Sequence, residues 1–373
     1  MRANNEFARA GNRMTLCLVH FGKHELTDSE RGSLLKTLTL VQPGEFSLSE
    51  TDAPEAPAPG QALVRVHRVG ICGTDLHAFR GRQPFFTYPR ICGHELGVEV
   101  VALGDGDTHG LKPGDHCAVE PYLNCGVCIA CRRGKTNCCA SLKVLGVHTD
   151  GGMREIIAVP ISKLHKSEEL SLEQLALVET LGIGAHAVDR ASIEPGEWAL
   201  VIGAGPIGLA VMQFAQAAGA RIIALDINTE RLAFCREKLD VEQTVHAGDD
   251  ALDRIREITG GDLATAVFDA TGNAASMMGA FQYAASGGRL VYVGLFLGDV
   301  TFYDPDFHRK EITLLATRNS TGRDFVRIIN LLESGQVDTA PWITHRADAE
   351  AMPAAFPTWL EPASGVIKAV VSF

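Results

Sequence analysis

The stretch Val201-Ile-Gly-Ala-Gly-Pro-Ile-Gly208 decides the fold that we predict for this chain. It ends the apolar run 198–202, which predicts a buried strand, and it leads into residues 207–218, whose composition favours a helix. A second apolar run, 221–225, ends at an acid, Asp226. A strand, a glycine-rich turn, a helix, a second strand and a terminal acid are together the fingerprint of a dinucleotide-binding fold.

The residues of this turn have separate expected roles in holding a dinucleotide. Gly203 permits the tight turn, Gly205 lets the backbone approach a pyrophosphate, and Gly208 lets the helix pack closely on the strand. Pro206 and Ile207 open the helix, whose free N–H groups and positive dipole end favour phosphate.

The acid at the end of the second strand predicts which dinucleotide binds. Asp226 is expected to accept hydrogen bonds from the adenosine ribose, and its carboxylate repels the 2′-phosphate of NADP, so NAD is favoured. Arg231 follows five residues later, but we expect it in an exposed first helical turn with Thr229 as a possible cap.

Length and composition limit the classes of protein to consider. The 373 residues suggest two domains, and 46% hydrophobic with 21% charged residues is ordinary for a soluble globular protein. The net charge of −11 and the lack of a basic run argue against a nucleic-acid partner, and no apolar stretch is long enough for a membrane span. The ten cysteines gather mostly in one cluster, which predicts thiolate ligands in a reducing cytoplasm.

The hydrophobic pattern predicts an α/β protein of two domains around this fingerprint. Residues 1–34 are expected to be a poorly ordered leader. Residues 35–185 contain short β-rich segments separated by glycine and proline, which predict a partly barrel-like domain. In residues 186–320 strands and helices alternate, which predicts a doubly wound parallel sheet, and residues 321–373 are expected to return to the first domain.

Four cysteines form a compact cluster with the spacing C-x2-C-x2-C-x7-C. Four thiolates on one short loop can surround a zinc ion tetrahedrally and leave no open position, so the site is expected to be structural. An iron–sulfur cluster is the competing interpretation, and the compact loop favours zinc. The residues are Cys125, Cys128, Cys131 and Cys139.

A second constellation predicts an open metal site. Cys72 and His94 each follow an apolar strand, and each has a carboxylate nearby in sequence. A thiolate and an imidazole suit zinc, and a third ligand would leave the fourth position to water or substrate. Glu179 is the preferred third ligand and Glu95 the alternative, while Asp75 is expected to orient the ring of His94.

These motifs resemble those of the zinc-dependent medium-chain dehydrogenases, in the alcohol dehydrogenase superfamily. GICGTD at 70–75, GHE at 93–95, CGxCxxCxxGxxxxC at 125–139 and VIGAGPIG at 201–208 have the order and spacing of that family. The chain is most similar to the polyol and sugar-acid branch, which includes sorbitol, threonine and L-galactonate 5-dehydrogenases.

The resemblance implies both a fold and a set of site residues. It implies a GroES-like β-rich catalytic domain split around a Rossmann domain, with Cys72 and His94 as catalytic zinc ligands. Either Glu95 or Glu179 is then the third ligand, and Lys368 contacts the cofactor pyrophosphate. It also implies a homotetramer or homodimer, for which the β-rich run 289–303 is a possible edge strand.

The function expected is NAD-linked oxidation of a secondary alcohol to a ketone. Thr74 and then His77 are predicted to carry the proton to solvent. Arg318 is a possible partner for a sugar-acid carboxylate, and an ordinary surface ion pair is the alternative. A sorbitol, threonine or general alcohol dehydrogenase remains open, as does an NAD(H)-binding sensor without catalysis.

Overall fold

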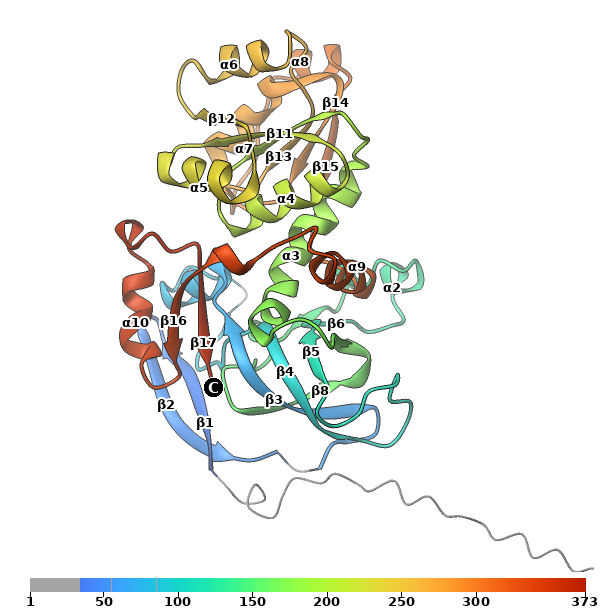
Figure 1. Cartoon of the computed structure of the whole chain (residues 1–373), viewed down its shortest axis with the longest axis vertical. Helices are drawn as coiled ribbons and strands as arrows, with labels where there is room; N and C mark the ends of the chain where they lie inside the picture. The colour runs from blue at the N-terminus through green and yellow to red at the C-terminus, as the bar shows by residue number, and fades with distance from the viewer. Residues whose placement is uncertain (1–33, 55, 85) are drawn as a thin grey trace, which may run out of the picture.

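The structure is a computed structural model that describes residues 34–54, 56–84 and 86–373. The predicted leader 1–34 lies outside these residues except for Leu34, the first residue of β1. Figure 1 shows two bodies, one built on a parallel sheet and one on a curved antiparallel sheet, with helix α3 between them. None of the described helices combines the length and the apolar character needed to cross a bilayer.

The first body is a six-stranded sheet in which all neighbouring strands are parallel. The strand order is β12-β11-β10-β13-β14-β15, and helices cover both faces (Figure 1). This arrangement confirms the predicted doubly wound fold. The strands are β10 (Trp198–Ile202), β11 (Arg221–Asp226), β12 (Gln243–His246), β13 (Ala264–Asp269), β14 (Ala284–Tyr292) and β15 (Thr313–Ala316). The helices are α4 (Pro206–Ala217), α5 (Thr229–Leu239), α6 (Ala251–Ile258), α7 (Ala274–Gly279) and α8 (Asp304–Arg309), and the 3₁₀ turn η3 (Ala280–Tyr283) follows α7.

The structure corrects the expectation of an edge strand for residues 289–292 of the run 289–303, whereas residues 293–303 form no strand within the chain. Its strand, β14, pairs with β13 on one side and β15 on the other, so it lies inside the sheet. The edge on that side is β15 instead, because the chain returns after α8 and adds one more parallel strand.

The second body is a seven-stranded, mainly antiparallel sheet with two separate antiparallel strand pairs, the first formed by β1 and β2 and the second by β6 and β7. Its path is β16-β17-β3-β4-β5-β9, with β8 also paired to β3. The strands are β1 (Leu34–Gln42), β2 (Glu45–Asp52), β3 (Gln61–Gly70), β4 (Glu95–Leu103), β5 (His116–Val119), β6 (Tyr122–Leu123), β7 (Lys143–Val144), β8 (Ile156–Pro160), β9 (Leu164–Lys166), β16 (Ile343–Asp348) and β17 (Lys368–Ser372). The helices are α1 (Gly73–Phe79), α2 (Ile129–Arg132), α9 (Gly322–Glu333) and α10 (Met352–Trp359), with the 3₁₀ turns η1 (Thr136–Cys138), η2 (Ile161–Lys163), η4 (Ala340–Trp342) and η5 (Pro362–Ser364).

Strand β17 carries the chain back into this second body. It pairs antiparallel with β3, and β16 lies parallel beside it at the sheet edge. The last strand is therefore hydrogen-bonded to the strand that precedes Cys72, although about 300 residues separate them in sequence.

Helix α3 (Leu172–Ala191) joins the two bodies without a break. It begins at Ser171, whose side chain accepts a hydrogen bond from the N–H of Gln174, and it ends at Ser192 in the left-handed conformation. The boundary predicted between residues 185 and 186 falls inside α3. Most of its side chains are buried, because it packs on β4 at one end and on α4 at the other.

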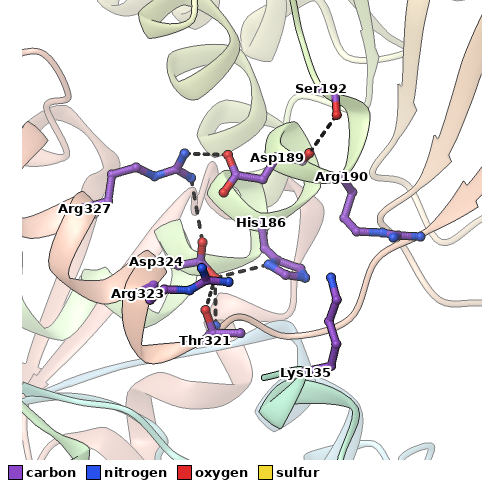
Figure 2. A pocket seen from close by; sticks show the side chains of 9 residues that line it. All are labelled: Lys135, His186, Asp189, Arg190, Ser192, Thr321, Arg323, Asp324 and Arg327. Carbon is purple, nitrogen blue, oxygen red and sulfur yellow. Dashed lines mark hydrogen bonds and ion pairs between the residues drawn. The ribbon is translucent and has the colours of Figure 1, made fainter. Parts of the chain in front are cut away.

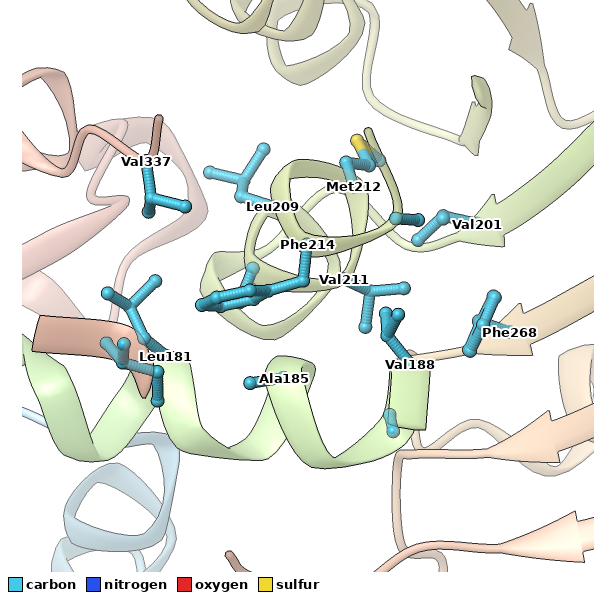
Figure 3. Close-up of a cluster of buried hydrophobic side chains, with 14 of the residues drawn as sticks. Leu181, Ala185, Val188, Val201, Leu209, Val211, Met212, Phe214, Phe268 and Val337 are labelled. Carbon is cyan, nitrogen blue, oxygen red and sulfur yellow. The ribbon is translucent and has the colours of Figure 1, made fainter. Parts of the chain in front are cut away.

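The contact between α3 and α4 depends on small residues. Figure 3 shows Leu181, Ala185 and Val188 of α3 packed below the side chains of α4. At Gly184 the two helices approach so closely that a Cβ atom would lie 2.5 Å from the Cβ of Ala210 and 2.7 Å from its carbonyl carbon. The glycine is therefore required by packing rather than by backbone conformation.

Replacing Gly184 by alanine is expected to destabilise the protein by about 1–3 kcal/mol, because the added methyl group forces the two helices apart. Differential scanning calorimetry measures the loss. The matched control is Gly279→Ala in helix α7, where the new Cβ meets only the Gln282 side chain at 3.8 Å. An equal effect of the two substitutions would contradict the packing argument.

The start of α9 generates a second prediction. Asp324 accepts hydrogen bonds from the N–H and hydroxyl of Thr321 and from the ring of His186. Burial alone raises the pKa of the Asp324 carboxyl, but these hydrogen bonds outweigh it and leave the pKa below its ordinary value. The carboxylate thus stabilises the fold above about pH 4, and this contribution is lost as the pH falls below that value.

Asp324→Ala is expected to lower the free energy of unfolding by about 1 kcal/mol or more at pH 7, where the carboxylate caps the helix. The gap between wild type and variant should narrow as the pH falls below about 4. Urea unfolding at a series of pH values measures it. A gap that stays constant down to pH 3.5 would show that the charged carboxylate is not responsible.

Candidate active site

Cys72, His94 and Glu95 come together where β3 ends and β4 begins. Cys72 is the N-cap of α1, directly after β3, and His94 precedes β4. One ligand atom from each of the three residues lies within 4.8 Å of the others. Gly70 makes this possible, because a side chain there would overlap the Glu95 carboxylate. The two sequence motifs thus form one buried group of thiol, imidazole and carboxylate.

Lys368 lies in the interior beside this group. Its ammonium donates to both carboxylate oxygens of Glu95 at 2.7 Å, to the Ile71 carbonyl at 3.2 Å and to the Thr180 hydroxyl at 3.1 Å. The side chains of Lys368 and Glu95 are only 2% and 1% exposed. We expected Lys368 at the cofactor pyrophosphate, and the structure places it differently, because β17 enters the sheet beside β3 and directs the amine at Glu95.

Glu179 lies close by on α3 but outside the 4.8 Å group. Its carboxylate accepts a hydrogen bond from the buried Tyr122 hydroxyl. Burial raises the pKa of the Glu179 carboxyl, and the nearby Glu95 carboxylate raises it further. The geometry therefore favours Glu95 over Glu179 as the third member of the group, and both remain candidates for holding the metal.

Asp75 does not make the expected hydrogen bond to His94. Its Oδ1 lies 4.0 Å from Nδ1 of His94, and neither atom has a hydrogen-bond partner. Its other oxygen accepts from the backbone N–H of Cys72 at 2.9 Å, as part of a capping box. One oxygen of the carboxylate that was expected to orient His94 thus caps helix α1 instead.

The buried groups fit a divalent cation. Burial raises the pKa of the Asp75 carboxyl, and the pKa of the Glu95 carboxyl is lowered because Lys368 and His94 outweigh the effect of burial. In the described part of the chain, two basic groups, the Lys368 ammonium and the His94 imidazole, thus face three carboxyl groups and one thiol, those of Asp75, Glu95, Glu179 and Cys72. Such an excess of buried acids is stable only with further positive charge or with protonation. A thiolate, an imidazole and a carboxylate are common zinc ligands, so the donor set fits zinc.

Thr74 and His77 lie on α1, three residues apart. Residues with this spacing share one side of a helix. Thr74 is half-buried next to Cys72, and His77 is exposed. The placement suits a path from the buried group to solvent, and the proton relay remains a prediction.

The four cysteines of the second motif also converge. The sulfur atoms of Cys125, Cys128, Cys131 and Cys139 all lie within 4.8 Å of one another. Cys138 is exposed and outside the group. Backbone N–H groups of Cys131 and Ala140 lower the pKa of the Cys128 thiol to about 6, which favours the thiolate form that binds metal. The donor set fits a closed, structural zinc site.

The glycine turn lies between β10 and α4, as the fingerprint predicts. Gly203 has φ +97°, and a Cβ on Gly208 would overlap the Gly203 carbonyl oxygen, so both positions require glycine. Pro206 and Ile207 form the first turn of α4, after Gly205 as the N-cap. This local geometry fits a pyrophosphate at the helix N-terminus.

Two side chains, those of Asp226 and Arg231, lie against this turn. Asp226 accepts hydrogen bonds from the N–H groups of Ala204 at 2.6 Å and Asn228 at 2.7 Å, so it also braces the turn itself. Arg231 was expected in an exposed helical turn, yet its Nη1 lies 3.6 Å from where a Cβ on Gly205 would be. Sequence spacing alone gave no sign that this guanidinium reaches the glycine turn, because the turn and α5 meet only after β10 and β11 pair.

Comparison with known proteins gives a consistent picture. Residues 58–169 match the alcohol dehydrogenase GroES-like domain, and residues 206–334 match the zinc-binding dehydrogenase domain. The chain is 41% identical over 314 residues to the L-galactonate-5-dehydrogenase of Escherichia coli K12, covering 84% of this chain and 92% of that protein. It is 32% identical over 311 residues to the L-threonine 3-dehydrogenase of Pyrococcus horikoshii, covering 80% and 87%.

Solved structures agree with the sequence relatives. The short chain alcohol dehydrogenase RspB of E. coli CFT073, crystallised with NADH, superposes with a TM-score of 0.85 at 28% identity and covers 92% of this chain and all of that one. The 2R,3R-butanediol dehydrogenase of Bacillus subtilis superposes with a TM-score of 0.83 at 27% identity, covering 91% and 99%. The chain therefore belongs to the zinc-binding alcohol dehydrogenase family, with a GroES-like domain and a Rossmann domain.

Proposed function

We propose that this protein oxidises a secondary alcohol of a sugar acid or polyol to a ketone and transfers the hydride to NAD. The observation that carries the proposal is the coexistence of a buried thiol–imidazole–carboxylate group with a complete dinucleotide turn in one chain. The similarity to L-galactonate-5-dehydrogenase supports a sugar acid as the substrate. Retention of both sites argues against a sensor without catalysis, since such a protein has no need of the metal group.

In this proposal Cys72, His94 and either Glu95 or Glu179 hold the catalytic zinc. A bound zinc ion would supply Lewis acidity that favours the alkoxide form of the substrate at neutral pH. Lys368 balances the charge of Glu95 and fixes the orientation of its carboxylate through two hydrogen bonds. Tyr122 fixes Glu179 in the same way.

Thr74 and His77 take the proton away from the substrate hydroxyl. Thr74 accepts it within the half-buried first turn of α1, and the exposed His77 passes it to solvent. A histidine suits this step because its ordinary pKa lies near neutral pH.

Gly203, Gly205 and the first turn of α4 hold the pyrophosphate of NAD, which would accept the hydride at its nicotinamide ring. Asp226 selects NAD over NADP, because its carboxylate repels a 2′-phosphate. Arg231 offsets part of this repulsion from its position near Gly205, which makes the preference for NAD a matter of degree.

Arg318 is the residue that we assign to the substrate carboxylate. Its side chain is exposed beside a cavity of about 450 Å³, and its backbone carbonyl is fixed by the side-chain amide of Asn137 at 2.8 Å. It lies near His148, whose pKa is lowered by burial and by the charges of Arg318 and Arg90. The guanidinium of Arg318 beside this cavity supports an anionic rather than a neutral substrate.

Cys72→Ala is expected to abolish NADH formation, with a loss beyond the 10–100-fold or so that removal of a supporting residue costs. The zinc content should fall from two ions to one per chain, since one of the two ligand groups is destroyed. NADH formation is followed by absorbance, metal by mass spectrometry and NADH binding by fluorescence.

Cys138→Ala is the control for this experiment, because that thiol is exposed and belongs to neither group. It should keep both zinc ions and full turnover. Turnover retained in a Cys72→Ala protein with one zinc ion would overturn the assignment of the catalytic site.

Arg318→Ala is expected to raise KM for aldonates about tenfold or more, because a charge-assisted hydrogen bond is lost, and to leave turnover of neutral polyols unchanged. The assay compares L-galactonate and other aldonates with sorbitol, threonine and simple alcohols. Arg256→Ala, on the exposed face of α6, is the control. If wild type turns over only neutral alcohols, the sugar-acid proposal fails, and an unchanged KM for aldonates removes Arg318 from it.

A further inference from the structure

A polar cavity of about 400 Å³ lies where three elements meet. These are the cysteine-rich loop, the last turns of α3 and the first turn of α9 (Figure 2). A neighbouring cavity of about 450 Å³ shares Lys135, His186 and Arg190 with it. None of the residues that line the 400 Å³ cavity belongs to the two metal groups or to the glycine turn. Its volume is in the range of small-molecule sites.

The acidic side chains of this cavity are already satisfied. Asp189 is paired with Arg327 at 2.5 Å. Asp324 accepts hydrogen bonds from Thr321 and from His186, and Arg327 lies 3.8 Å from it (Figure 2). Both carboxylates thus have partners in the cavity wall, and the single guanidinium of Arg327 offsets one of their two charges.

His186 is hydrogen-bonded at both of its ring nitrogens. Its Nδ1 donates to Asp324 at 3.1 Å, and its Nε2 accepts from the side-chain amide of Asn137 at 3.1 Å. The same amide nitrogen donates to the Arg318 carbonyl at 2.8 Å, which fixes the orientation of the amide. The buried floor of the cavity is thus a hydrogen-bonded network that contains the Asp324 carboxylate.

Three cations surround this floor without a carboxylate partner. Lys135 comes from the cysteine-rich loop, Arg190 from α3 and Arg323 from α9, and all three are exposed. Within the described residues none of them forms an ion pair, and Arg190 donates only its Nε–H, to the Ala316 carbonyl at 3.3 Å. Figure 2 shows Lys135 and Arg323 extending toward His186. In a chain of net charge −11, this convergence concentrates positive charge at one place.

We propose that this cavity is a second ligand site, which binds the phosphate group of a small molecule. Guanidinium groups match phosphate oxygens with paired N–H donors, and the lysine adds a compact charge. Donors that approach from three elements suit a tetrahedral group with oxygens on several sides, whereas a planar carboxylate is satisfied by one guanidinium. The ligand then bridges the cysteine-rich loop, α3 and α9.

The test is isothermal titration of inorganic phosphate into the zinc-loaded protein with saturating NADH, so that the glycine turn is occupied. Wild type is expected to show saturable binding. The double variant Lys135→Gln/Arg323→Gln is expected to bind phosphate at least about tenfold more weakly, since two charged contacts are lost. NADH fluorescence confirms that the variant is folded.

The control double variant is Lys238→Gln/Arg254→Gln, which removes the same charge from the exposed surfaces of α5 and α6. It should bind phosphate as wild type does. Equal affinity in wild type and the cavity variant, or equal loss in both double variants, would overturn the proposal. If wild type binds no phosphate and the cavity variant has a changed sedimentation coefficient, the three cations form a subunit contact. That outcome would likewise overturn the proposal.

A parallel titration with a hexose 6-phosphate identifies the source of the phosphate group. Tighter binding than inorganic phosphate, lost in the cavity variant, supports a phosphorylated sugar as the ligand. Weaker binding that is also lost in the cavity variant supports free phosphate.

Discussion

The buried ion pair between Lys368 and Glu95 is the interaction on which the candidate active site depends. It joins the last strand of the chain to the residue that follows His94. Removing either partner alone leaves an uncompensated charge in the interior, which is far more costly than loss of an exposed pair. The metal group is therefore complete only when β17 has paired with β3. The site therefore draws on segments that lie before and after the parallel sheet in the sequence.

Much of the fold was predictable, because its strongest signals are local. The run 221–226 is a strand with the expected bounds, since an apolar segment between a loop and an acid has few alternatives. β12 was missed, because Gln243-Thr-Val-His246 is short and mostly polar. The domain boundary predicted between residues 185 and 186 falls within α3, which runs through the glycines at 182 and 184 without a break. Both are required by close contacts with Ser320 and Ala210, which only the assembled structure reveals.

The candidate site was also predictable where its residues lie in local sequence motifs. Cys72, His94 and the four clustered cysteines lie in short motifs with defined spacing, and the structure brings each set together. The partners of these residues come from distant segments. Tyr122 reaches Glu179 across 57 positions and Lys368 reaches Glu95 across 273, so no local pattern indicates either contact. Asp75 shows the opposite case, because the expected hydrogen bond to His94 is absent and one carboxylate oxygen caps helix α1 instead.

The continuity of α3 restricts how the two bodies can move. A single helix is stiff over its length, and α3 is anchored by β4 at one end and by α4 at the other. The boundary predicted near residue 185 is thus no hinge. Any closure of one body over the other has to be absorbed beyond the helix, in the left-handed turn at Ser192 and in the returning strand-to-helix link at 317–321. The side-chain amide of Asn137 donates a hydrogen bond to the Arg318 carbonyl within that link, so the cysteine-rich loop restrains movement of the link.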